Sequence, residues 1–353
     1  MGPGLKSTGA KKAATKSPPL QLNFDDNRFL AALFGEHDRN LARIEKELDV
    51  EVSSRGNRIL IAGNSWSQQA AKSALTNLYE LLAQGHNLSD GEVTGAIRMA
   101  EASVTEHGLN MDTTPGGAGA GSVIRTRRRA VTPRSPNQAA YVREMRAKDM
   151  VFGIGPAGTG KTFLAVALGV SMLIEGRVER IVLSRPAVEA GERLGFLPGD
   201  VREKIDPYMR PLYDALYHTL PSDQVAKYLD AGVIEIAPLA FMRGRTLADA
   251  FIILDEAQNT TRVQMKMLLT RMGESSYMVI TGDLSQIDLP SGENSGLAEA
   301  AQILADMDEV GFVYFSDADV LRHPLVSRVV RAYQSHNEKV GPKEANKKNE
   351  RDL

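Results

Sequence analysis

The spacing of hydrophobic residues predicts a small mixed unit in the first 107 residues of the chain. Leu41, Ile44 and Leu48 recur at helical spacing, whereas Ile59 and Ile61 alternate with Arg58 and Leu60 as in a strand. The predicted strands are 20–24, 50–54 and 58–62, and the predicted helices are 26–34, 37–48 and 65–84. A β-α-α-β-β-α order results, with a turn at Gly35, a hairpin turn at 55–57 and a further helix over 85–107.

A different pattern begins near residue 149, where runs of Val, Ile and Leu alternate with helical stretches. Continuous apolar strands of this kind are typical of a mostly parallel sheet covered by helices on both faces. The predicted strands are 150–154, 180–184, 233–237, 251–255, 277–281 and 311–315. Just upstream, 123–132 is predicted as a basic hairpin and 135–147 as a helix.

Composition changes mark the boundaries between these regions. Gly108 to Gly121 holds five glycines and one proline, which favours a flexible linker. Polar, poorly hydrophobic ends are expected to be disordered. The predicted organisation is a basic arm at 1–19, a small domain with an extra helix at 20–107, a linker at 108–122, an α/β core with a basic lead-in at 123–335 and a polar tail at 336–353.

Bulk composition excludes several classes of protein. The chain of 353 residues has no cysteine, so disulfides, thiolate metal sites and thiol nucleophiles are excluded, and a cytoplasmic location is expected. Its longest nearly apolar run, 163–174, is shorter than the roughly 20 residues of a membrane span, and no membrane association is expected. The net charge of −2 hides five arginines without an acid between Arg125 and Arg134. That run is either a solvated linker or a contact for nucleic acid.

A phosphate-binding loop is predicted directly after the first core strand. The stretch has the form G-x-x-x-x-G-K-[ST], with glycines that let backbone N–H groups wrap a phosphate. Its residues are Gly155, Pro156, Ala157, Gly158, Thr159, Gly160, Lys161 and Thr162. Lys161 is expected to contact the β and γ phosphates of ATP, and Thr162 to bind Mg²⁺ at a helix N-terminus.

Two acids follow the strand predicted at 251–255. Asp255 is expected to hold Mg²⁺ together with Thr162, and Glu256 to orient or deprotonate the attacking water. The next strand runs into Gly282-Asp283-Leu284-Ser285-Gln286, at the carboxyl edge where ligands bind in open parallel sheets. Gln286 is predicted to sense the γ phosphate.

One cation is expected to stabilise charge on the transferred phosphoryl group. Four arginines near turns or strand ends are candidates, and spacing leaves the choice among them open: Arg185, Arg243, Arg245 and Arg322. Of these four, Arg322 is predicted to be the catalytic arginine. Gln138, within the helix that leads into the core, is a candidate for reading the adenine edge.

Together with these motifs, several further stretches make the chain resemble the PhoH family of ATP-binding proteins. Asp255-Glu256-Ala257-Gln258 and Gly282-Asp283-x-x-Gln286 are similar to paired motifs of superfamily 1 helicases. Further stretches carry the family resemblance: 183–192, 194–200, 204–208, 238–247 and 319–323. The resemblance implies a Mg²⁺-dependent ATPase with a RecA-like P-loop NTPase core, and a connection to phosphate starvation and RNA metabolism.

The N-terminal order of elements resembles a KH domain, in which a Gly-x-x-Gly loop clamps single-stranded RNA. Here the loop reads Gly35-Glu36-His37-Asp38, with acids where phosphates would pass. The unit therefore either contacts RNA or serves for packing and protein contact.

The region 149–335 has room for one RecA-like core, whereas a superfamily 1 helicase closes ATP between two. A homo-oligomer is therefore predicted, with a hexamer as the closed form and an arginine supplied by the neighbouring subunit. Two functions remain open: an ATPase that remodels RNA, and a slow nucleotide-gated module that docks an RNA-processing nuclease. A small-molecule kinase is disfavoured, because Glu256 is better suited to activating water.

Overall fold

A computed structural model describes residues 17–106, 122–186, 201–290 and 292–321, together with positions 326 and 329. Several expectations fall elsewhere in the chain: most of the basic arm, the glycine-rich linker, the polar tail, the motif at 188–200 and Arg322. The division into domains stays a prediction. None of the helices in the described ranges combines the length and apolar character that a bilayer crossing needs.

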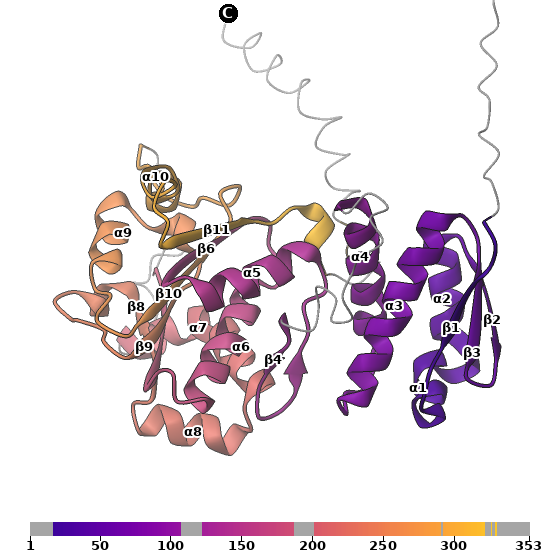
Figure 1. Cartoon of the computed structure of the whole chain (residues 1–353). Helices are drawn as coiled ribbons and strands as arrows, with labels where there is room; N and C mark the ends of the chain where they lie inside the picture. Colours follow the sequence, from indigo (N-terminus) through magenta and orange to yellow (C-terminus); the bar gives the residue numbers. More distant parts are fainter. Residues whose placement is uncertain are drawn as a thin grey trace, which may run out of the picture.

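The N-terminal region forms a three-stranded antiparallel sheet packed against helices (Figure 1). Its sheet order is β1-β3-β2, from β1 (Leu20–Asn23), β2 (Glu51–Arg55) and β3 (Arg58–Ala62). Its helices are α1 (Leu30–Phe34), α2 (Arg39–Leu48), α3 (Ser65–Ala83) and α4 (Asp90–Glu106), with short 3₁₀ turns at Asn27–Phe29 and Glu36–Asp38.

The predicted order of elements is confirmed, with two corrections. The helix expected over 26–34 begins with a 3₁₀ turn, because Asp26 accepts a hydrogen bond from the Arg28 N–H and the α-helix starts only at Leu30. The helix expected from residue 85 starts at Asp90. At this helix start the Ser89 N–H donates to Glu92 Oε2 and Ser89 Oγ accepts from the Gly91 N–H, and Gly85 in a left-handed turn separates the helix from α3. The KH resemblance itself stays a prediction.

The core is a six-stranded sheet, parallel throughout, in the order β11-β6-β10-β9-β7-β8. Its strands are β6 (Met150–Ile154), β7 (Arg180–Arg185), β8 (Ile234–Pro238), β9 (Ala250–Leu254), β10 (Tyr277–Gly282) and β11 (Val310–Tyr314). All six lie within about one residue of their predicted bounds. The hairpin of β4 (Ile124–Arg125) and β5 (Ala130–Val131) is also formed as predicted.

Helices cover both faces of this sheet, as the continuous apolar strands require. One face packs on α5 (Pro136–Ala147), α6 (Lys161–Ile174), α7 (Val201–Thr219) and α8 (Ser222–Asp230). The other packs on α9 (Arg262–Leu269) and α10 (Gly296–Ile303). Neighbouring strand residues alternate between the two faces, for example Phe251 and Ile252 of β9. In Figure 1, α3 and α4 stand between the core and the three-stranded sheet.

Candidate active site

The loop that joins β6 to α6 has a backbone that requires glycine. Gly155, Gly158 and Gly160 have φ values of +146°, +84° and +81°. A Cβ added at Gly155 would lie 2.4 Å from the carbonyl oxygen of Phe315. The loop is held from outside by a hydrogen bond from the Leu321 N–H to the Gly158 carbonyl, 2.9 Å. A side chain at Gly155 would therefore clash with the backbone of Phe315, and the positive φ values at all three positions favour glycine.

Lys161, the first residue of α6, lies folded against this loop. Its Nζ donates to the carbonyl oxygens of Gly155 and Pro156, at 2.7 and 2.8 Å. Only 8% of Lys161 is exposed. Burial lowers the pKa of Lys161 below the ordinary lysine value, while the negative charges of Asp283, Asp255 and Glu256 oppose that shift. The lysine is thus a buried cation surrounded by acids at the carboxyl edge of the sheet.

Asp255 follows β9 and meets the start of α6. Thr162 Oγ1 donates to its Oδ1 at 2.6 Å, and Thr281 Oγ1 donates to the same oxygen at 2.8 Å. Thr281 lies on β10, the strand between β6 and β9, so it joins the two halves of the site. The two residues predicted to hold a metal ion, Thr162 and Asp255, are therefore brought into direct contact.

Glu256 lies one residue further on, in a left-handed backbone conformation with φ +53°. Gln258 Nε2 donates to its Oε2 at 2.6 Å. The Arg185 guanidinium lies 3.8 Å from Asp255 Oδ2 and 3.6 Å from Glu256 Oε1. Arg185 ends β7, which β10 and β9 separate from β6, and the parallel order of the sheet brings it to this edge. Of the three candidate arginines that lie in the described ranges, Arg185 is the one placed beside both acids.

Asp283 connects the end of β10 to the loop. Its Oδ2 accepts from the Ala157 N–H at 3.2 Å and from Gln286 Nε2 at 2.6 Å. Burial disfavours its charge, but hydrogen bonds from Ser285 and Ala157 and the charge of Lys161 leave the pKa of Asp283 below its ordinary value. Gln286 is thus held at the rim of the site by an ionised carboxylate.

Gln138 of α5 lies behind the loop. It is 2% exposed, its Oε1 accepts from the Arg134 N–H at 2.7 Å, and its Nε2 donates to the Thr159 carbonyl at 2.8 Å. A Cβ added at Gly160 would lie 3.0 Å from Nε2. The structure therefore places Gln138 against the loop backbone, and its reading of an adenine edge stays a prediction.

The structure gathers most predicted site residues at one edge. Lys161, Thr162, Asp255, Glu256 and Gln286 all meet there, within one network of contacts. Arg243 is exposed, Arg245 forms a two-bond pair with Glu235, and Arg322 is outside the described residues.

Two contributors were missed by sequence reasoning: Thr281, which bridges to Asp255, and Gln258, which contacts Glu256 and accepts from the Asp283 N–H at 3.0 Å. Thr281 lies near the end of the buried strand β10, and Gln258 lies shortly after the buried strand β9. A polar residue close to the end of such a strand was the sequence signal available for both.

A glycine loop between a parallel strand and a helix, with its lysine facing acids from other strand ends, defines a P-loop NTPase core. A family profile described as "PhoH-like protein" matches residues 130–334. A PhoH-like protein of Bacillus subtilis (strain 168) is 47% identical over 309 residues, covering 87% of this chain and 94% of that protein. The chain belongs to the PhoH family.

Other similarities were found at lower coverage or lower identity. A PhoH-like protein of Mycobacterium tuberculosis (strain H37Rv) is 46% identical over 88% of this chain and 86% of its own length. Protein PhoH of Escherichia coli (strain K12) is 43% identical over 58% of each chain. A solved structure, the Sulfolobus solfataricus SWI2/SNF2 ATPase core in complex with dsDNA, covers 57% of this chain and 48% of its own at 12% identity, with a TM-score of 0.33. A TM-score this low does not establish a common fold.

Proposed function

We propose that the protein binds ATP with Mg²⁺ and hydrolyses it. The observation that carries this proposal is the convergence of Lys161, Thr162 and Asp255, with Glu256 one residue beyond the buried acid. Loop amides and the N-terminus of α6 favour an anion at this position. A nucleotide-binding protein without turnover has no need of a second carboxylate adjacent to the first.

The donor set fits Mg²⁺. Thr162 and Asp255 offer a hydroxyl and a carboxylate 2.6 Å apart, and hard oxygen atoms are the ligands that Mg²⁺ prefers. Within the described ranges, no group of three or more acidic or histidine side chains forms a metal cage. One carboxylate together with substrate phosphates is the usual Mg²⁺ arrangement in phosphoryl-transfer sites. When bound, the ion neutralises charge on the phosphates.

The remaining polar groups have distinct tasks in this proposal. Glu256, held by Gln258, orients and deprotonates the attacking water. Arg185 supplies positive charge at the transferred phosphoryl group from within the same chain. Gln286 at the rim senses the γ phosphate.

The direct test is phosphate release by the full-length protein, measured with ATP and Mg²⁺ and again with excess chelator. We expect turnover that the chelator abolishes and that added Mg²⁺ restores. Nucleotide binding without any Mg²⁺-dependent release would leave a binding protein and refute the hydrolase.

We further propose that turnover acts on RNA through the basic hairpin. Arg125, Arg127, Arg128 and Arg129 are exposed, and the Arg129 guanidinium lies over the Phe163 ring at 5.2 Å. Phe163 directly follows Thr162, so a ligand on the hairpin would sit against the start of α6. Single-stranded RNA should raise turnover, with an effect that falls steeply as salt increases. An Arg125→Ala/Arg127→Ala variant should lose that stimulation and keep the basal rate.

A second candidate is a slow nucleotide-gated module that docks an RNA-processing nuclease. The exposed acids Glu36 and Asp38 favour it, because they oppose an RNA backbone at the loop where a KH domain would clamp one. Unchanged turnover across several RNAs would favour this candidate over RNA remodelling.

Assembly into a homo-oligomer, with a hexamer as the closed form, also remains a proposal. It rests on the one parallel-sheet core that the described residues form, since a second core or a neighbouring subunit would be needed to cover the nucleotide. Light scattering with ATP present tests it, and a fully active monomer would contradict it.

A further inference from the structure

An unbroken chain of polar contacts joins the N-terminal region to the nucleotide loop. Arg134 Nη2 donates to Glu92 Oε1 of α4 at 2.8 Å, and the Arg134 backbone N–H donates to Gln138 Oε1 at 2.7 Å. Gln138 Nε2 then donates to the Thr159 carbonyl at 2.8 Å. Three successive hydrogen bonds therefore run from a helix of the small unit to the backbone that cradles phosphate.

The surface of α4 is shaped to receive Arg134. A Cβ at Gly91 would lie 2.5 Å from the guanidinium carbon of Arg134, and a Cβ at Gly95 would lie 3.0 Å from its Cα. Glycine within a helix costs about 0.5–1 kcal/mol relative to alanine. Two glycines one turn apart on the same face thus give up helix propensity, and close approach of Arg134 accounts for both.

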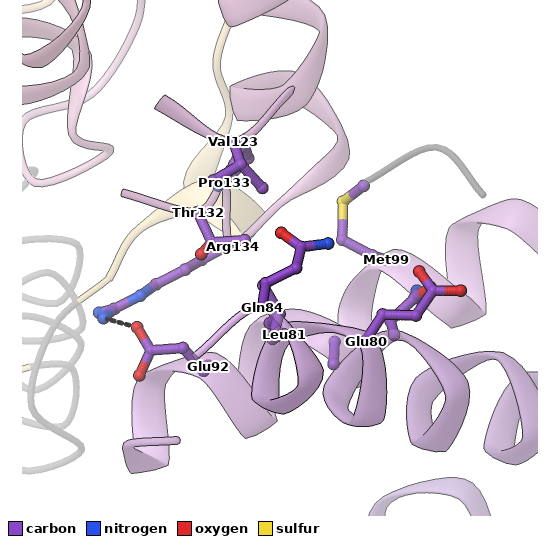
Figure 2. Close-up of a pocket in the computed structure, with 11 residues that line it drawn as sticks. Glu80, Leu81, Gln84, Glu92, Met99, Val123, Thr132, Pro133 and Arg134 are labelled. Atoms are coloured by element: carbon purple, nitrogen blue, oxygen red, sulfur yellow. Dashed lines mark hydrogen bonds and ion pairs between the residues drawn. The ribbon is translucent and has the colours of Figure 1, made fainter. Parts of the chain in front are cut away.

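The junction around this ion pair is not tightly filled. Figure 2 shows the pair at one side of a pocket between α3, α4 and the segment that follows β5. Leu81, Gln84, Met99, Val123 and Pro133 line it together with the two charged residues. The junction thus combines close approach of Arg134 to α4 with a pocket beside it, and the Glu92–Arg134 pair is one of its fixed contacts. A second contact joins Arg98 to the Ala318 carbonyl at 3.3 Å.

We propose that Glu92 and Arg134 are positioning residues through which the N-terminal unit sets the geometry, and hence the nucleotide affinity, of the P-loop. The inference rests on the proposed binding of ATP at Lys161. Arg134 acts through its own backbone N–H, which holds Gln138 in the one orientation that reaches Thr159. With the pair broken, Arg134 is free to shift and the buried amide of Gln138 loses its fixed partner.

Full-length variants test this through equilibrium binding of a fluorescent ATP analogue. Arg134→Met keeps the stem and removes the charge. Glu92→Gln removes the charge and retains the side-chain oxygen that caps α4 through Ser89. Each should raise Kd by about threefold to tenfold, as expected for loss of a partly buried ion pair. The double variant should be no worse than either single one, because both remove the same contact.

Asp26→Asn is the matched control, since it removes the charge of the Arg28–Asp26 pair within the same N-terminal unit, and the contacts of Asp26 with Arg28 and Tyr79 do not involve α4 or Arg134. It should leave Kd unchanged. Arg134→Lys should recover part of the affinity. Turnover at saturating ATP should fall less than about twofold in every case, because the chemistry at Glu256 is untouched.

A lowered melting temperature with unchanged Kd in Arg134→Met and Glu92→Gln would overturn the inference and leave a purely structural junction. A fall in saturated turnover as large as the loss of affinity would overturn it as well. If the wild-type chain binds no nucleotide, the proposed function fails first. If the wild type binds nucleotide and both variants bind it with the same Kd as the wild type, the proposed function stands and only the coupling through Glu92 and Arg134 is rejected.

Discussion

The loops before α6 and α2 both contain glycine, but they differ in backbone conformation and in what surrounds them. The loop before α6 uses three glycines with positive φ and encloses the buried Lys161. The loop before α2 has one glycine with positive φ, Gly35 at +75°, and the next positive φ values fall on His37 and Asp38, at +53° and +56°. A turn before a helix is therefore not by itself an anion site.

What fills the space beside each loop explains the difference. At Gly35 the neighbour is the buried Asn40 side chain, which donates to the Leu33 carbonyl at 3.0 Å and ties the two helices together. At Gly155 the neighbour is the backbone of Phe315. The first loop is packed by its own helices with acids on its exposed side. The second has Lys161 folded against its carbonyl oxygens, at the position where we propose that phosphate binds.

Lys161→Ala should produce the largest loss, because it removes the cation from a buried site that anions must enter. We expect nucleotide affinity to fall about 100-fold or more, with turnover lost in parallel. Isothermal titration with an ATP analogue measures the first and phosphate release the second. Lys72→Ala, on the exposed face of α3, is the control and should change neither. Near-normal affinity in Lys161→Ala would show that the loop does not bind phosphate.

Glu256→Gln should separate binding from chemistry. The amide keeps the shape of the side chain but cannot accept a proton, so turnover should fall about 10² to 10⁴-fold while Kd changes little. Glu36→Gln in the other loop should leave the rate unaltered. A normal rate in Glu256→Gln would assign the base elsewhere.

Substitution by alanine should lower the free energy of unfolding more at Gly155 than at Gly35. Gly155→Ala drives a Cβ into backbone at φ +146°, and we expect a loss of about 3 kcal/mol or more in the free energy of unfolding. Gly35→Ala adds a side chain at φ +75° but meets only the end of the Asn40 side chain, at 2.8 Å, and should cost about 1–2 kcal/mol. Urea unfolding compares them. Equal losses would mean that the P-loop relaxes as readily as the N-terminal turn.

We expect the lowered pKa of Lys161 to set the alkaline limit of the proposed hydrolysis. Lysine carries its charge below its pKa, so kcat/KM should fall as pH rises through that value in the free protein. Because burial lowers the pKa of Lys161, the decline should begin below the ordinary lysine value of about 10.4. A pH profile of kcat/KM locates it, with circular dichroism confirming that the fold persists. A decline only above about 10.4 would contradict the burial effect.

The smallest effect is expected at the N-terminal loop. Asp38→Asn removes one exposed negative charge without altering a turn that asparagine tolerates. RNA-stimulated turnover should change by less than about twofold, since screening weakens a single exposed charge. A large gain in RNA affinity, measured by filter binding at low salt, would place RNA at this loop after all.

Much of the fold was predictable because each element carries its own pattern. The six core strands are short apolar runs, and the loop glycines stand at fixed spacing after the first of them. The start of α4 was less accessible, since Gly85 and the Ser89–Glu92 cap interrupt a segment whose helical pattern looks continuous. The position of Arg185 beside Glu256 could not be predicted from spacing, because strand order decides which strand ends are neighbours.

By itself, the sequence determined the class of chemistry, since the G-x-x-x-x-G-K-[ST] stretch and the acids after a buried strand are local requirements of phosphate and metal binding. Tertiary structure alone decided the partnerships: Thr281 bridging to Asp255, Arg185 beside Glu256, and Gln138 linking Arg134 to the loop. Residues far apart in the chain meet only once the parallel sheet aligns its strand ends, and that alignment depends on packing across the whole core.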